Sequence, residues 1–323
     1  MKYQDSQIEV VKALFQESKL DGKFGGKERA FVLKKYEDNF LPQIDVENVL
    51  SYFKDNGINW WKGNKPTCHT LSSQIACINH LYSLRNDDNA VLAIARTIDK
   101  DIDGVERLNN DKEKWRDYIS FEVVSLNDHL NEKKGRNKKL TRGNQCTSID
   151  AVILARKHEK RILLVIKWKY VEHYGNIDKS KNTKNCKSGE TRVHNYSGSD
   201  VDNPNLIQNS KQLKSVKEYN GSVYFHEPFY QLMRQTLWAE QMIRYKEDEF
   251  IKADDFIHVH VVPSKNTELR GKYKCSGEDL HTTWTSQLKA PSKYVLISPD
   301  ELLSKLPESY CTLKESLSER YWK

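Results

Sequence analysis

The chain has 323 residues, of which 37% are hydrophobic and 30% charged. It is therefore long enough to bury one large core or two modest ones. No run of about 18 consecutive apolar residues occurs, which argues against a transmembrane helix. The formal net charge of +7 is modest for a chain of this length, so where the basic residues gather matters more than their sum.

The N-terminal residues and the cysteines indicate a compartment. The stretch MKYQDSQIEVVKALF carries acidic residues and lacks the apolar segment and small-residue cleavage site of a signal peptide. Six cysteines are scattered without a regular framework, which is typical of reduced thiols. We therefore expect a cytoplasmic protein.

The first third of the chain is predicted to be helical. Apolar residues recur at helical spacing in four segments, the second of which closes at Gly57. These segments are 6–20, 46–57, 69–85 and 89–98. We expect residues 1–60 to form a helical N-terminal portion and residues 61–323 the main domain, together making one continuous globular unit.

The middle of the chain changes to β-rich sequence. Segments 115–126, 147–157 and 160–172 are strand-like, and a short polar turn separates the last two. Downstream, the pattern predicts a helix over 228–247, strands over 255–263 and 293–299, and a final short helix. This order of elements predicts an α/β fold with a mixed central sheet flanked by helices.

The hairpin formed by 147–157 and 160–172 gathers charge at its open end. If its turn is centred between His158 and Glu159, Asp150 lies opposite Lys167. Side chains two apart on a strand share a face, so Asp150, Lys167 and Lys169 lie together. A pairing shift of one residue would break this alignment.

An aspartate on one strand, with a carboxylate and a lysine two apart on the next, is the arrangement used in metal-dependent phosphodiester cleavage. Two carboxylates hold a hydrated Mg²⁺, which lowers the pKa of a bound water and stabilises charge on phosphorus. The lysine orients or activates the attacking water. The alternative is a plain buried hairpin whose charges mark its solvent end.

Three stretches of the chain resemble a known family. SIDAVI followed by LLVIKWKY, together with WWKGNKPTCHTLSSQIACINHLYSLR and EPFYQLMRQTLWAEQM, is similar to a bacterial family of type II-like restriction endonucleases in the PD-(D/E)xK nuclease superfamily. The resemblance runs from about Trp60 to about Gln241. It implies a restriction-endonuclease-like fold, Mg²⁺ as cofactor and double-stranded DNA as substrate. It also implies Asp150 as the first metal ligand and Lys169 as the motif lysine.

The chain departs from this family pattern at Lys167, where the pattern IEWKY has glutamate. At about 4 Å and an effective dielectric of about 20, one pair of unit charges is worth roughly 4 kcal/mol, and a divalent ion doubles that. We therefore expect impaired Mg²⁺ binding and little or no DNA cleavage. Two origins remain open: an inactivating change, made or selected so that a toxic enzyme can be produced, and a natural lineage that lost catalysis.

Several polar residues are candidates for supporting roles. Glu122 would add a carboxylate if its strand pairs with 147–157, although a salt-bridged edge glutamate is the more common outcome. Gln74 matches the resembling family and is a candidate contact to metal or phosphate, or else a helix-surface glutamine. Gln231 and Arg234 share a helix face, with Gln235 beside them, where such residues can steady the lysine or a phosphate.

Two lysine-rich segments, 131–145 and 178–192, are read either as solvated loops or as contacts to a polyanion, where each neutralised phosphate releases counterions. Their candidate DNA-binding residues are Lys134, Arg136, Lys138, Lys139, Arg142, Lys181, Lys184 and Lys187. Asn182 is a further candidate for base contacts. Because two cuts across a symmetric site call for two active sites, we expect a homodimer. We expect no membrane partner.

The sequence supports other kinds of functional site less strongly. Cys68, His69, Cys77 and His80 carry zinc-ligand atoms but lack the usual spacing. His258 and His260 alternate with valines on a strand and are explained by a sheet face that meets polar side chains. As functions, a non-catalytic DNA-binding protein on a nuclease fold and a repair or recombination nuclease remain alternatives.

Overall fold

The computed structural model describes residues 2–61, 63–108, 113–132, 146–182, 187–198 and 204–323. A six-stranded sheet lies at its centre, with strand order β3-β5-β6-β7-β8, and β4 also pairs with β5. The strands are β3 Gly104–Glu106, β4 Ile119–Val123, β5 Ile149–Lys157, β6 Lys160–Trp168, β7 Asp255–Val261 and β8 Tyr294–Ile297. A separate two-stranded sheet joins β1 Lys23–Phe24 to β2 Lys27–Glu28.

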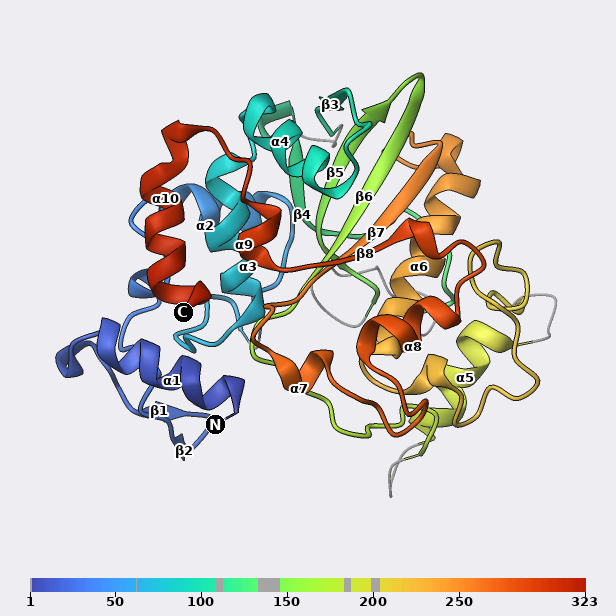
Figure 1. Ribbon diagram of the computed structural model, residues 1–323, viewed down its shortest axis with the longest axis horizontal. Helices are drawn as coiled ribbons and strands as arrows, with labels where there is room; N and C mark the ends of the chain where they lie inside the picture. Colours follow the sequence, from blue (N-terminus) through green and yellow to red (C-terminus); the bar gives the residue numbers. More distant parts are fainter. Residues whose placement is uncertain (1, 62, 109–112, 133–145, 183–186, 199–203) are drawn as a thin grey trace.

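The central sheet is mixed, as the sequence predicts. β3, β4 and β6 run antiparallel to β5, whereas β7 is parallel to β6 and β8 is parallel to β7. Helices pack on both faces of this sheet (Figure 1). The predicted α/β class is therefore confirmed.

The described residues form ten α-helices. They are α1 Tyr3–Leu14, α2 Val46–Asp55, α3 Ser73–Leu81, α4 Asp88–Ile98, α5 Ser188–Ser197, α6 Phe229–Arg244, α7 Thr267–Arg270, α8 Leu280–Ser286, α9 Pro299–Leu302 and α10 Cys311–Leu317. The helix expected over 6–20 ends at Leu14. Residues 188–192, expected in a loop, instead begin α5. Within the described ranges, no helix is both long and apolar enough to cross a membrane.

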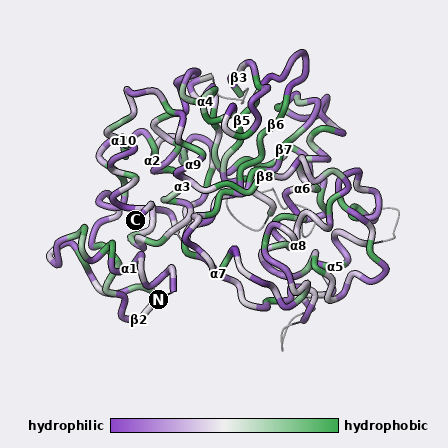
Figure 2. The backbone as a smooth tube through the Cα atoms, in the orientation of Figure 1, coloured by the Kyte–Doolittle hydropathy of each residue, from purple (hydrophilic) through white to green (hydrophobic). Residues whose placement is uncertain are grey.

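Side-chain alternation along β5 and β6 divides the interior into two cores. Ile153, Leu164 and Ile166 belong to the first core, with residues of α2, α3, α4 and α10. Val152 and Val165 belong to the second, with residues of α6 and α8. Both faces of the strands are apolar because both are covered, and Figure 2 shows hydrophobic residues gathered along the central strands.

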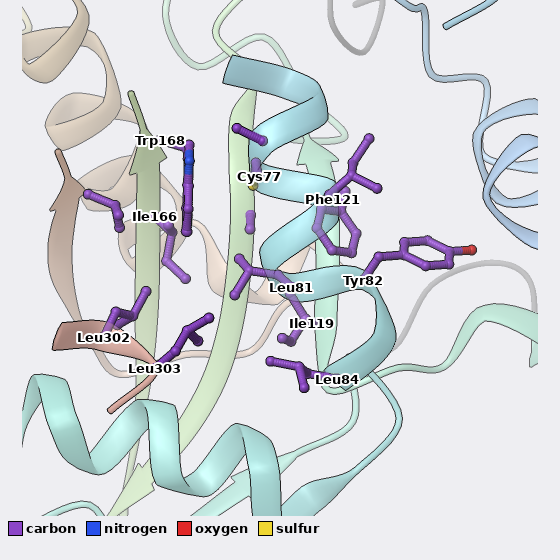
Figure 3. Close-up of a cluster of buried hydrophobic side chains, with 14 of the residues drawn as sticks. Cys77, Leu81, Tyr82, Leu84, Ile119, Phe121, Ile166, Trp168, Leu302 and Leu303 are labelled. Atoms are coloured by element: carbon purple, nitrogen blue, oxygen red, sulfur yellow. The ribbon is translucent and has the colours of Figure 1, made fainter. Parts of the chain in front are cut away.

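The first core ties α3 to the sheet. In Figure 3, Cys77 and Leu81 of α3 lie near Ile166 and Trp168 of β6. The side chain of Ser72 accepts a hydrogen bond from the Ile75 amide and begins the helix, which satisfies one of its unpaired amides. This packing fixes the first turn of α3, where Gln74 lies.

The hairpin has the register that its turn predicts. Lys157 pairs with Lys160, Leu154 with Leu163, and Ala151 with Ile166. One residue further toward the open end, Asp150 and Lys167 come together. The sheet therefore presents the charged end of the hairpin beside the first turn of α3.

Candidate active site

A polar cavity of about 1010 Å³ opens at this end of the hairpin. Asp150 and Lys167 line it from β5 and β6, Glu122 from β4, Gln74 from α3, and Gln231 from α6. Five secondary-structure elements thus contribute polar side chains to one space. Polar groups that converge in a cavity of this size are typical of a binding or catalytic site.

Asp150 and Lys167 form an ion pair inside the cavity. The Lys167 Nζ atom lies 3.0 Å from Asp150 Oδ1, and both side chains are largely buried, with 13% and 19% exposed. The backbone amide of Trp168 donates to Asp150 Oδ2 over 2.7 Å. Both carboxylate oxygens of Asp150 therefore have hydrogen-bond donors from β6.

Lys169 is placed differently from Lys167. Only 5% of it is exposed, and its Nζ atom donates to Gln231 Oε1 over 2.9 Å and to the hydroxyl of Tyr174. Gln231 and Tyr174 line the cavity. Lys169 is therefore buried against the cavity wall, and α6 fixes the position of its ammonium group.

Glu122 lies in a local break of β4. Its neighbours Phe121 and Val123 pair with Ala151 and Ile149, but Glu122 itself has a φ of 48°, a left-handed conformation that is rare for a non-glycine residue. Its carboxylate accepts from Gln74 Nε2 over 2.8 Å and from Ser148 Oγ over 2.7 Å. Burial, reinforced by the nearby charge of Asp150, raises the pKa of Glu122.

These residues do not fit a Mg²⁺ ion. The carboxylate oxygens of Asp150 and Glu122 are engaged by protein donors, and one of those donors is the ammonium of Lys167. Across the described ranges, no group of three or more His, Cys, Asp or Glu side chains could hold a metal ion.

The absence of such a group among the described residues bears on zinc as well. His80 is buried between the Ala76 carbonyl and the Trp322 indole, and burial lowers its pKa to about 3. His80 therefore stays neutral as a core residue beside α3. The zinc alternative drawn from Cys68, His69, Cys77 and His80 gains no support from the part of the chain that the structure describes.

A second polar network lies in the cavity wall, centred on Glu132, a residue that no sequence pattern marks. Glu132 accepts from Arg234 Nη2 over 2.8 Å, from the Tyr196 hydroxyl over 2.7 Å and from Thr147 Oγ1 over 2.7 Å. Arg234 and Glu132 are separated by 102 residues in the chain. Such a contact leaves no local pattern, although Arg234 itself stands out beside Gln231 on α6.

The polar residues behind the sheet explain the two strand histidines. His258 contacts Gln235 Oε1 and the Thr236 hydroxyl, and His260 contacts the Tyr294 hydroxyl. Burial lowers the pKa of His258 to about 3. Both histidines are buried among polar side chains, as the sequence analysis expects.

The structure describes only some of the candidate DNA-binding residues. Lys134, Arg136, Lys138, Lys139, Arg142 and Lys184 lie outside the described residues. The side chains of Lys181 and Lys187 are 78% and 84% exposed and pair with Asp178 and Glu190. Asn182 caps α5, because its Oδ1 atom accepts from the amides of Gly189 and Glu190.

Comparison with known families identifies the chain. A family described as Restriction Endonuclease associating with ARP matches residues 11–322. The chain belongs to this restriction endonuclease family. No curated protein and no solved structure matches it. The family covers nearly the whole chain, well beyond the segments at Trp60–Gln241 that carry the resemblance, and restriction endonucleases act on DNA.

Proposed function

We propose that this restriction endonuclease family member binds double-stranded DNA at the cavity, on a PD-(D/E)xK-type arrangement that Lys167 has silenced. The observation that carries the proposal is the 3.0 Å ion pair between Lys167 Nζ and Asp150 Oδ1. In the PD-(D/E)xK pattern the position of Lys167 belongs to a carboxylate, and Asp150 is the first metal ligand. Here a positive charge of the protein lies beside that aspartate.

The charge balance explains why cleavage is not expected. A cation at Asp150 would have to displace the ammonium of Lys167 and then remain beside it. At about 4 Å and a dielectric of about 20, each pair of unit charges contributes roughly 4 kcal/mol, so a divalent ion meets about twice that repulsion where a glutamate would attract it. We therefore propose that Mg²⁺, the usual cofactor of such enzymes, binds poorly and that the chain cleaves little or no DNA.

The same positive charge favours binding of the phosphate backbone. Lys167 and Lys179 line the cavity, and cationic side chains that neutralise phosphates supply much of the affinity for DNA. We propose that the protein binds cytoplasmic DNA as a homodimer, since a symmetric site is read by two copies. If light scattering of the complex with a symmetric duplex showed only one 37.8 kDa chain per duplex, the proposed dimer would be contradicted.

The decisive experiment restores the carboxylate. Lys167→Glu, incubated with plasmid DNA and Mg²⁺, is expected to produce discrete fragments that disappear with EDTA. The double variant Lys167→Glu with Asp150→Asn should not cut, and Lys167→Met tests whether removing the positive charge alone is enough. Thermal unfolding of each variant verifies that it is folded.

Each other outcome corrects a particular part of the proposal. Cutting by the unchanged chain would show that Lys167 does not silence it. A folded Lys167→Glu variant that binds DNA without cutting would favour a non-catalytic DNA-binding protein. Nicking confined to branched or damaged duplexes would favour a repair or recombination nuclease.

A further inference from the structure

One face of α5 is directed into the same cavity as Asp150 and Lys167. Its polar side chains there are Ser188, Thr191, Arg192 and Asn195. Their spacing of three, four and seven residues places them on one side of a helix. The end of the lysine-rich segment 178–192 thus lies in a helix, and a row of hydrogen-bonding side chains on that helix faces the cavity.

The C-terminal end of α5 is anchored. The Tyr196 ring is 2% exposed, and its hydroxyl donates to Glu132, which also binds Arg234 of α6. At the start of the helix, a Cβ atom on Gly189 would lie 2.2 Å from the Ser180 carbonyl oxygen, so only glycine fits there. Because both ends are held, the polar row keeps a defined orientation toward the cavity.

Two members of the row keep hydrogen-bonding capacity for a ligand. The side-chain amide of Asn195 makes no hydrogen bond with the rest of the described chain, which leaves a donor and an acceptor side by side. The bonds from Arg192 to other described residues use Nη1 alone, toward the Lys179 carbonyl and Ser188 Oγ. Thr191 differs, since its hydroxyl donates to the Lys187 carbonyl.

We propose that α5 is the helix that reads base sequence at this site, with Asn195 and Arg192 as its specificity-determining residues. The inference rests on the proposed binding of double-stranded DNA. A carboxamide can pair with the major-groove edge of adenine through one donor and one acceptor, and a guanidinium with that of guanine through two donors. An α-helix fits the major groove, so α5 can present these groups to base edges while the cavity holds the phosphate backbone.

The test is selection of bound duplexes from a randomised pool, in buffer without metal. Asn195→Ala and Arg192→Ala should each lose preference at one or two base pairs, where the unchanged protein discriminates about tenfold or more. Alanine is a good helix former, and thermal unfolding verifies that each variant is folded. His194→Ala is the matched control, since His194 is exposed on α5 and lies outside the cavity lining.

The outcomes separate this inference from the proposed function. If the variants select the same sequence as the unchanged protein, or if the unchanged protein binds duplexes without any preferred sequence, α5 is not the reading helix although DNA binding stands. Absence of duplex binding by the unchanged protein would overturn the proposed function and this inference with it. A loss of preference in His194→Ala equal to that in Asn195→Ala would also overturn the assignment.

Discussion

Lys169 and Gln231, which lie 62 residues apart in the chain, are joined by a hydrogen bond of 2.9 Å from Nζ to Oε1. The bond links the end of β6 to the first turns of α6. Gln231 also donates to Glu227 Oε2, so one amide serves a cation and an anion at once. The hydrogen bond holds the ammonium group of Lys169 in place. It also gives this buried cation an acceptor where water cannot supply one.

We expect Gln231→Leu to destabilise the fold by about 1–3 kcal/mol, because a buried ammonium loses an acceptor and a carboxylate loses a donor. The measurement is urea unfolding at neutral pH. Arg244→Ala, an exposed position at the end of the same helix, is the control and should change stability by less than about 0.5 kcal/mol. Equal effects of the two substitutions would show that Lys169 finds another partner.

Glu122 should make stability depend on pH. Burial and the charge of Asp150 raise the pKa of this carboxyl, so the folded protein keeps its proton to higher pH than the unfolded chain does. Stability from this group is therefore present at low pH and is lost as pH rises from the unfolded value, about 4.3, through the raised folded value.

Glu122→Gln removes this titration and keeps the backbone strain of the position. The stability of the variant relative to the unchanged protein should increase with pH, by about 1.4 kcal/mol per unit between the two pKa values, and then level off. Urea unfolding at several pH values between 4 and 8 measures the difference. A difference that stays constant or shrinks as pH rises would be inconsistent with a raised pKa.

The sheet and the hairpin register were predictable because their signals are local. Two apolar strands joined by a short turn fix their own pairing, and the alternation of side chains then places Asp150 and Lys167 on one face. Glu122 reaches the same place through the pairing of β4 with β5, which the sequence analysis stated only as a condition. By contrast, β3 has three residues, too few to show an alternation.

The remaining features depend on tertiary contacts. The sequence of α5 is polar and its helix is short, so packing of Tyr196 and the cap from Asn182 stabilise it more than intrinsic propensity does. The Glu132 network joins three distant segments. The burial of Lys169 likewise follows from α6 and Tyr174, whereas the strand pattern alone suggests a lysine at the open end of the sheet, equivalent to Lys167.

Salt dependence tests the basic segment that precedes β5. Each phosphate contact contributes about −0.9 to the slope of log binding constant against log salt concentration. Replacing Lys134, Arg136, Lys138, Lys139 and Arg142 together by glutamine should therefore make the slope for duplex binding less steep by about 0.9 for every contact that is lost, and weaken binding at low salt. Fluorescence anisotropy with a labelled duplex at several salt concentrations gives the slope.

Lys160→Gln is the control, because Lys160 is exposed at the turn of the hairpin, at the other end of β6 from Lys167. This substitution should leave the slope unchanged. If the fivefold variant kept the slope of the unchanged protein, the segment would lie away from the DNA, and the cationic side chains of the cavity would carry the electrostatic part of binding.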